Sequence, residues 1–351
     1  MLLGRRDRNR LTIVAVTMLA VCGAASAFTL TLYPERPWWL SVWIGSASGL
    51  LIGPPIVLWL LLGVDTPLGR RLKRLPLIAY LVLNAVVMTA ILMAGHVAAY
   101  HLIWPNEERV SFLDDPDLPA SMFFSVSLVT AISVAVELRR LIGPGVFGAV
   151  LAGSYRHPRR ERRIFLMLDL VGSTGIAERL GPERFLAFLD RWIHALTEPL
   201  LASDGRIYRY IGDEVILTWR WTEDAPARAL AFAVEAARTI SGATVAWQRD
   251  FGMVPRMRLA LHGGPVVAGE IGDVKREITF LGDTLNTAAR IAQESRQHEA
   301  LIVASAEVID SVALPDGLAA HPLGPVRLRG KAEPLELVCL APAIDVRAPA
   351  A

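Results

Sequence analysis

Two aspartates in the second half of this 351-residue chain stand beside apolar segments, where an unpaired carboxylate is unfavourable. Asp169 directly follows the apolar run Phe165–Leu168, and Asp213 lies in a Gly-Asp-Glu turn. A carboxylate in apolar surroundings is costly to desolvate unless a cation or hydrogen bonds compensate it. Carboxylate oxygens suit Mg²⁺ and Mn²⁺, so both residues are candidate metal ligands. Taken singly, Asp169 could equally cap the next helix, and Asp213 could simply form a hairpin turn.

Other residues could bind or stabilise a phosphate group. Asn286 and Arg290 stand four apart, which places both on one face of the helix predicted for Thr284–Glu294. Residues at the predicted start of another helix could present backbone N–H groups to phosphate oxygens; these residues are Val171, Gly172, Ser173 and Thr174. Each pattern alone also fits an ordinary exposed helix face or helix start.

Together and in this order, these residues resemble the active site of the class III nucleotidyl cyclases, which make cyclic AMP or cyclic GMP from a nucleoside triphosphate. The resemblance covers residues 160–342, about half of the chain. It implies a ferredoxin-like α+β palm domain that uses two divalent cations per site, Mg²⁺ or Mn²⁺. The residues implied at the metal site are Asp169, Asp213 and Leu170.

The resemblance also assigns residues to the substrate. Asn286 would orient the ribose, and Arg290 would neutralise phosphate charge in the transition state. The residues implied in binding the nucleotide are Val171, Gly172, Ser173, Thr174, Arg209, Gly212, Thr279, and Arg329 or Lys331. For Arg329 and Lys331, which stand in Leu-Arg-Gly-Lys, the alternative is a solvated turn.

The two positions that read the purine depart in part from the family pattern. Adenylyl cyclases commonly have lysine where this chain has Arg209, whereas Thr279 is familiar at the second position in bacterial adenylyl cyclases. Guanylyl cyclases usually have glutamate and cysteine there, and neither is present. Arginine differs from lysine in shape and hydrogen bonding. The pattern favours ATP as substrate and leaves GTP as the alternative.

One chain contains one such domain, and the resemblance therefore implies a homodimer. In the family, the metal-binding aspartates of one domain meet the purine and transition-state residues of its partner. Asp169 and Asp213 would act from one chain, and Arg209, Thr279, Asn286 and Arg290 would act from the other.

The first half of the chain is predicted to be membrane-embedded. The hydrophobic fraction of 53% is high for a soluble protein. Four apolar stretches approach or exceed the roughly 20 residues that cross a bilayer; they are Leu11–Leu32, Trp38–Leu62, Leu77–Ile103 and Ala120–Val136. Arginines and lysines precede the first stretch and follow the second and fourth, whereas the third connection is acidic. This distribution predicts a multi-pass protein of the cell (inner) membrane, in contact with lipid, with both termini and the catalytic domain in the cytoplasm.

Alternatives remain for parts of the membrane half. The first stretch with Ala25-Ser26-Ala27 also resembles a cleavable signal peptide. Gly45, Gly49 and Gly53 repeat every four residues, which fits either a dimer seam or packing within one bundle. Polar residues at the end of the third stretch, including His96, could bind a ligand or metal, but more often form interhelical hydrogen bonds.

The domains predicted are a four-span domain over 1–138, a juxtamembrane linker over 139–163, the catalytic domain over 164–342 and a disordered tail over 343–351. In the catalytic domain, strands and helices alternate, with predicted hairpins at Gly212-Asp213 and Gly263-Gly264-Pro265. With two cysteines, no disulfide framework or thiolate metal site is available. Without a recognised module, the arginines near the linker do not indicate nucleic-acid binding.

Three other functions compete with a nucleotidyl cyclase. A diguanylate cyclase also carries a Gly-Asp-Glu turn, but Ile211 and Val215 replace the glycine and phenylalanine of its signature. A catalytically inactive nucleotide-binding membrane sensor would tend to have lost an aspartate or the arginine. A membrane carrier would need buried charge in its spans, which these stretches lack. The stimulus and the downstream effector are not indicated by the sequence.

Overall fold

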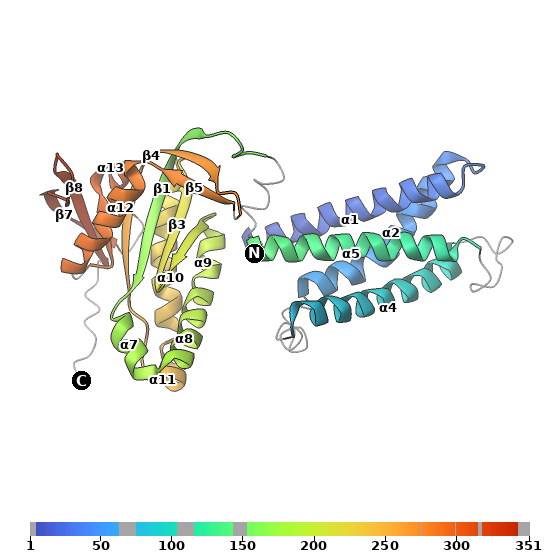
Figure 1. The fold of residues 1–351 in the computed structure, drawn as a ribbon, viewed down its shortest axis with the longest axis horizontal. Coiled ribbons are helices and arrows are strands. Elements are labelled where there is room, and N and C mark those ends of the chain that lie inside the picture. Colours follow the sequence, from blue (N-terminus) through green and yellow to red (C-terminus); the bar gives the residue numbers. More distant parts are fainter. Residues whose placement is uncertain are drawn as a thin grey trace. The chain divides into compact units, whose positions relative to one another are not determined.

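The computed structural model describes residues 5–62, 75–103, 116–142, 153–274, 276–298, 300–314 and 318–342. The chain divides into two compact units (Figure 1). The helical unit is Met1–Phe147, and the sheet unit is Gly148–Ala351.

Four long helices make up the described part of the helical unit. They are α1 (Arg5–Leu32), α2 (Trp38–Leu62), α4 (Leu77–Ile103) and α5 (Leu118–Ile142). Each contains an apolar window of 19 to 22 residues, which by length and composition is enough to cross a membrane. The predicted spans are therefore confirmed as long apolar helices, and α5 extends past the predicted end at Val136.

The glycine repeat of α2 packs against α1 within the same chain. A Cβ atom at Gly45 would lie 2.5 Å from Cα of Ser26, and one at Gly49 would lie 2.9 Å from Cα of Cys22. Such distances leave no room for a side chain, so these glycines permit the two helices to approach closely. The repeat thus serves packing inside the bundle, and the alternative of a dimer seam through these glycines is not supported.

The sheet unit is built on one eight-stranded sheet. Its strands are β1 (Arg159–Leu170), β2 (Arg206–Ile211), β3 (Glu214–Arg220), β4 (Met257–Ile271), β5 (Glu277–Leu281), β6 (Ile302–Ser305), β7 (Leu318–Val326) and β8 (Leu335–Pro342). The order is β2-β3-β1-β4-β6-β8-β7, with β5 paired to β4. The pairing of β4 with β6 is parallel, and the other pairings are antiparallel.

The predicted hairpin at Gly263-Gly264-Pro265 is wrong, because β4 runs straight through it and pairs with β1 from Arg159 to Leu170. The glycines are needed for close packing and not for a turn. A Cβ at Gly263 would lie 2.2 Å from the Trp221 ring, and one at Gly264 would lie 2.7 Å from Oγ1 of Thr284. Glycine in a strand can mark a close approach of another group as well as a turn, and the packing decides which applies here.

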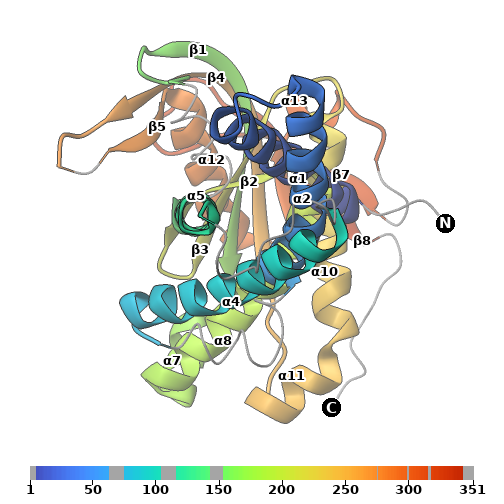
Figure 2. The ribbon, with the colours of Figure 1, turned by 90° about the vertical axis from the view of Figure 1, so that its right-hand side faces the viewer.

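Helices cover both faces of the sheet (Figure 1, Figure 2). They are α7 (Ser173–Leu180), α8 (Pro182–Ala195), α9 (Thr197–Ala202), α10 (Ala225–Gly242), α11 (Thr244–Phe251), α12 (Asp283–Glu294) and α13 (Ala306–Ile309), with a short 3₁₀ helix, η4 (Ser295–Gln297). Alternate residues of β1 divide the core: Leu166 and Leu168 pack with α8 and α10, whereas Phe165 and Met167 pack with α12. The α+β architecture is confirmed, with helices on two sides of one sheet.

Several element boundaries differ from the predicted ones. The predicted helix Pro182–Ser203 is divided at Leu196 into α8 and α9, and the predicted helix Ala225–Phe251 is divided at Ala243 into α10 and α11. Strand β7 was not predicted. Asp283 is the first residue of α12 and not its N-cap, which is Gly282 with φ 145°.

The basic segment before the predicted domain boundary at residue 164 belongs to β1, which begins at Arg159. Arg163 is buried, and its guanidinium donates hydrogen bonds to Glu161 at 2.6 Å and to the Tyr155 hydroxyl at 3.0 Å. Arg162 donates to Glu307 at 2.7 Å. Both arginines therefore belong to the sheet unit, and the predicted linker over 139–163 overlaps the first five residues of β1.

Candidate active site

The sheet brings the two candidate metal ligands together. Asp169 is the penultimate residue of β1, and Asp213 lies in the turn between β2 and β3. Because Leu168 pairs with Val215 in antiparallel register, the turn falls beside Asp169. Gly212 has φ 63°, the left-handed conformation that glycine adopts without strain in such a turn. The carboxyl groups of Asp169 and Asp213 are therefore close enough for the charge of Asp213 to raise the pKa of Asp169.

The electrostatics of this pair are unfavourable in the absence of a cation. Burial, and next the charge of Asp213, raise the pKa of Asp169 above its ordinary value. Burial, and next the charge of Asp169, likewise raise the pKa of Glu214, the first residue of β3. Three acidic side chains thus share one edge of the sheet, which we name the carboxylate edge (Asp169, Asp213 and Glu214).

Two arginines partly offset this negative charge. The Nη2 atom of Arg296 in η4 lies 3.5 Å from Oδ2 of Asp169. Arg258 on β4 is opposite Asp169 in the strand register. The charges of both arginines act to lower the pKa of Asp169, but they are outweighed by burial and Asp213. The carboxylate edge therefore keeps an excess of acidic groups.

The residues at the carboxylate edge provide the type of oxygen ligand that a divalent cation binds. Mg²⁺ is usually held by one or two carboxylates, with waters and substrate phosphates completing its shell. Asp169 and Asp213 supply two carboxylates, and Leu170 ends β1 beside them. Among the described residues, no group of three or more His, Cys, Asp or Glu is arranged around a single metal position. A cation here would thus depend on substrate or water for the remaining ligands.

The segment after Asp169 opens a helix, as predicted. Gly172 has φ 73° and precedes α7, which begins at Ser173. The backbone N–H of Val171 donates to the carbonyl of Arg256 at 2.9 Å, which ties the segment to the start of β4. In the described part of the chain, no side chain caps this helix start, so Ser173 and Thr174 lie where backbone N–H groups lack intrahelical acceptors.

Arg209 and Thr279, the two predicted purine-reading residues, lie in neighbouring parts of one chain. The guanidinium of Arg209 on β2 donates to Oε2 of Glu277 at 3.0 Å, and Glu277 and Thr279 lie on the same face of β5. Thr279 is buried, and its Oγ1 has no hydrogen-bond partner among the described residues. The ring of Tyr208 packs against Phe280 beneath this region.

Asn286 and Arg290 lie on α12, with Asn286 exposed and Arg290 half-buried. The turn that contains Arg329, Gly330 and Lys331 packs against this helix. A Cβ at Gly330 would lie 3.4 Å from Nη2 of Arg290, and Gly330 has φ 72°. Arg329 is exposed.

Lys331 pairs with an aspartate at the start of α12. Its Nζ atom donates a hydrogen bond to Oδ2 of Asp283, and this bond is the main cause that lowers the Asp283 pKa. The charge of Arg290 also contributes to lowering it. We name Asp283, Arg290 and Lys331 the α12 cluster.

Within one chain, the α12 cluster and the carboxylate edge do not contact each other among the described residues. Arg296, which contacts Asp169, follows Asn286 by ten residues of almost continuous helix. This corresponds to a rise of about 15 Å. Among the described residues, no hydrogen bond or ion pair connects Asp169 or Asp213 with Asn286 or Arg290.

Sequence reasoning missed four residues of the site region. Glu214 could have been found, because it stands next to Asp213. No sequence pattern indicated the other three residues, which are Glu277, Arg258 and Arg296. Their positions depend on strand register and on where α12 ends.

Comparison with known proteins agrees with this architecture. The family described as "Adenylate and Guanylate cyclase catalytic domain" matches residues 157–340. Adenylate cyclase 2 of Rhizobium meliloti (strain 1021) is 31% identical over 330 residues, which cover 93% of this chain and 90% of that protein. A bacterial light-regulated adenylyl cyclase of known structure is 18% identical, with a TM-score of 0.53, and covers 65% of this chain and 67% of its own. The structural likeness supports the fold, and the sequence matches go further: the chain belongs to the class III adenylate and guanylate cyclase family and is a nucleotidyl cyclase with four apolar helices before its catalytic domain.

Proposed function

We propose that this protein is a membrane-anchored adenylate cyclase, which converts ATP to 3′,5′-cyclic AMP and pyrophosphate at a homodimer interface. The observation that carries the proposal is the placement of Asp169 beside the turn that holds Asp213, where burial and mutual repulsion favour a bound cation. The similarity to a protein named Adenylate cyclase 2 over most of both chains supports ATP as substrate.

In the proposed mechanism, Asp169, Asp213 and the backbone at Leu170 would hold two divalent cations, Mg²⁺ or Mn²⁺. When bound, such cations supply activation of the ribose 3′-oxygen and neutralise charge on the leaving pyrophosphate. The ribose 3′-hydroxyl would give its proton to water, its oxygen would bond to the α-phosphorus, and pyrophosphate would leave with the electron pair of the broken P–O bond. Backbone N–H groups at Ser173 and Thr174 bind phosphate oxygens, and Gly212 keeps the turn open to the nucleotide.

The partner chain would supply the second half of each site. Asn286 orients the ribose, and Arg290 stabilises charge on the α-phosphate in the transition state. Lys331 or Arg329 would bind the terminal phosphates. Because about 15 Å of helix separates Asn286 from the residue that contacts Asp169, two chains are the natural way to complete one site.

Adenine would be read by Arg209 and Thr279. The pairing of Arg209 with Glu277 occupies part of its guanidinium, and a carboxylate acceptor beside it suits the exocyclic amine of adenine. The buried Thr279 hydroxyl, which has no partner among the described residues, can hydrogen-bond the same edge of the base.

The proposed location is the cell (inner) membrane, in contact with lipid, with the catalytic domain and both termini in the cytoplasm. Four candidate spans, the arginines at the start of α1 and the basic residues that follow α2 support this orientation. Nucleic acid is not expected as a partner.

The test is product formation by the purified full-length protein with ATP or GTP and with Mn²⁺ or Mg²⁺. We expect cyclic AMP from ATP, and we expect Asp213→Ala to abolish it. Asp190→Ala is the matched control, since Asp190 is an exposed aspartate on α8, and it should leave the rate unchanged.

Other outcomes would correct the proposal in different ways. Cyclic GMP as the main product would keep the mechanism and replace the substrate. No cyclic product from a folded dimer would favour an inactive nucleotide-binding sensor. Equal loss of activity in both variants would show that the effect of Asp213→Ala is not specific to the site.

A further inference from the structure

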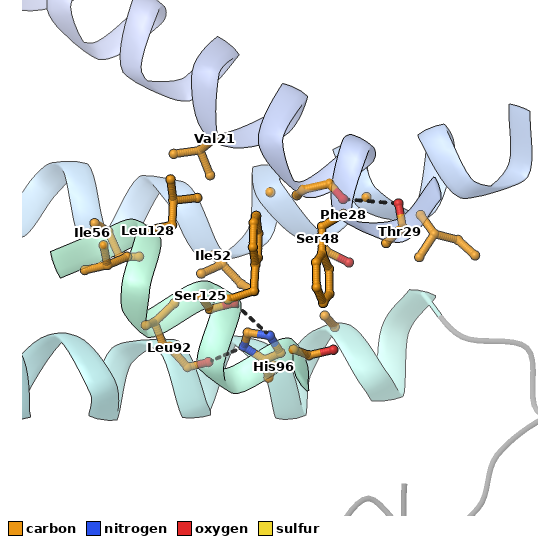
Figure 3. Close-up of a pocket in the computed structure, with 18 of the residues that line it drawn as sticks. Val21, Phe28, Thr29, Ser48, Ile52, Ile56, Leu92, His96, Ser125 and Leu128 are labelled. Carbon is orange, nitrogen blue, oxygen red and sulfur yellow. Dashed lines mark hydrogen bonds between the residues drawn. The ribbon is translucent and has the colours of Figure 1, made fainter. Parts of the chain in front are cut away.

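All four helices of the helical unit line one cavity of about 120 Å³ (Figure 3). It lies toward the ends of α1 and α4 that precede the connections to α2 and α5, and thus at the end of the bundle opposite to the C-terminus of α5. Neither the family assignment nor the proposed reaction gives this cavity a role.

The walls of the cavity are mainly apolar and carry no permanent charge. Residues such as Val21, Ile52 and Leu128 form one part, and the rings of Phe28 and Phe124 stack with centroids 4.3 Å apart. No Asp, Glu, Lys or Arg is among the lining residues. A charged ligand would therefore be desolvated without compensation, so the cavity selects an uncharged one.

One wall presents a hydrogen-bonding site. The Nδ1 atom of His96 lies 2.9 Å from the carbonyl oxygen of Leu92, and Nε2 lies 3.3 Å from Oγ of Ser125 (Figure 3). A carbonyl oxygen only accepts hydrogen bonds, so Nδ1 carries the proton, and Nε2 of the neutral ring is an acceptor. The Ser125 contact is long for a hydrogen bond, which leaves Nε2 open to a better donor.

The hydroxyl of Ser48 also lines the cavity, from the side of α2. A serine hydroxyl can donate a hydrogen bond as well as accept one. Ser48 could therefore donate to the oxygen of a ligand hydroxyl group that itself donates a hydrogen bond to His96. His96 and Ser48 therefore offer an acceptor and a hydroxyl to one hydroxyl group of a ligand, and the apolar residues of the lining suit a ring. The other polar residues of the lining are Thr17, Thr29, Tyr33, Ser121 and Ser125.

We propose that this cavity binds an uncharged, ring-sized molecule with one hydroxyl group, of the phenol class. Its volume is close to the about 150 Å³ of an apolar cavity that takes up benzene, and is too small for a whole lipid. The ligand hydroxyl donates to Nε2 of His96, and its ring occupies the space beside Phe28 and Ile52.

The experiment uses the full-length protein in detergent micelles and follows ¹⁹F NMR titrations with 4-fluorophenol and 4-fluorotoluene. We expect saturable binding of the phenol, about three- to tenfold tighter than binding of the toluene, as one net hydrogen bond implies. His96→Leu removes the acceptor without filling the cavity, and it should abolish this preference.

Ser125→Leu fills the cavity, and it should weaken the binding of both probes at least about tenfold, since overpacking excludes the ring. Ser127→Leu is the matched control, because Ser127 is exposed on the same helix and is not a lining residue. It should bind as the unchanged protein does.

Three results would overturn the proposal. The first is non-saturable uptake of both probes, which signifies partition into detergent. The second is equal affinity for the two probes in the unchanged protein. The third is equal weakening by Ser125→Leu and Ser127→Leu, which would assign the effect to helix packing. Retained helical content by circular dichroism shows that each variant is folded. If Ser125→Leu does not fold, the comparison of the two probes in His96→Leu still decides the proposal.

Discussion

The carboxylate edge and the α12 cluster are both polar groups of the catalytic domain, but their charges are balanced in opposite ways. At the carboxylate edge, Asp169 has a raised pKa because of burial and the neighbouring Asp213. In the α12 cluster, Asp283 has a lowered pKa because Lys331 donates a hydrogen bond to it. Within the chain, Lys331 balances the charge of Asp283, whereas Asp169 and Asp213 have too little positive charge beside them.

This difference distinguishes a carboxylate whose charge the chain itself balances from carboxylates whose charge a ligand would balance. An acidic pair that the fold pushes together costs free energy, and such a cost persists at functional sites where a ligand offsets it. An ion pair formed within the chain, such as Asp283 with Lys331, fixes the position of both side chains before a ligand binds. In the proposed mechanism the carboxylate edge would therefore be the metal side of the site, and the α12 cluster would be a pre-formed phosphate side.

The largest expected effect is on the carboxylate edge. Asp169→Asn should lower the rate of cyclic nucleotide formation at least about a thousandfold, because several kcal/mol of transition-state charge stabilisation are lost. It should leave the thermal midpoint unchanged or raise it, since one of two repelling charges is removed. Product assays and thermal unfolding test this. A sharp fall in the midpoint would show that Asp169 stabilises the fold and would remove the contrast with the α12 cluster.

The second prediction tests whether the two regions act from different chains. Arg290→Ala alone should lower activity about a hundredfold or more, as expected for loss of a group that stabilises transition-state charge. When Asp169→Asn and Arg290→Ala chains are co-expressed, mixed dimers contain one intact site. Activity should return to about a quarter of the unchanged rate, because half of randomly formed dimers are mixed.

Separately purified and unmixed samples serve as the control for this complementation. If the mixture is as inactive as its components, each site is formed within one chain, and the proposed homodimer arrangement is wrong.

The third prediction concerns His262, which lies on β4 near the α12 cluster. Burial, and next the charge of Lys331, lower the pKa of His262 from 6.5 to about 4, and its Nδ1 lies 2.8 Å from Oγ of Ser305. Below pH 6.5 the unfolded chain takes up a proton that the folded chain does not, so stability falls as pH falls toward 4. Between pH 7 and pH 5 the loss should be about 2 kcal/mol.

Denaturant unfolding at several pH values measures this slope. His262→Asn should flatten it, whereas His321→Asn, at an exposed position of β7, should not. An unchanged slope in His262→Asn would assign the pH dependence to other groups.

The smallest expected effect is on base selectivity. Glu277→Gln releases Arg209, whose donors fit O6 and N7 of guanine, so preference should move toward GTP by about three- to tenfold. The ratio of kcat/KM for ATP and GTP measures it. Glu270→Gln, on the paired strand β4, is the control. An increased preference for ATP would exclude the proposed role of Glu277.

Much of the candidate site could be proposed from the sequence because its residues lie in short segments with their own local signals. Asp169 at the end of an apolar strand, Asp213 in a glycine turn and Asn286 with Arg290 on one helix face depend only on local periodicity. Lys331 was predicted as a phosphate ligand, and the structure adds its pairing with Asp283. Glu277 and Arg296 could not be predicted, because strand register and the end of α12 place them.

The sequence by itself determined the two-part organisation, the four apolar helices and the family, since hydrophobic length and separated motifs are properties of the chain. Only the tertiary structure decided that β4 is continuous through Gly263-Gly264, that Gly45 and Gly49 pack within the bundle, and that a cavity beside His96 lies between four helices. The physical reason is the same in each case. A glycine can form a turn or permit close approach, and a cavity exists only between packed elements, so neighbours distant in sequence make the choice.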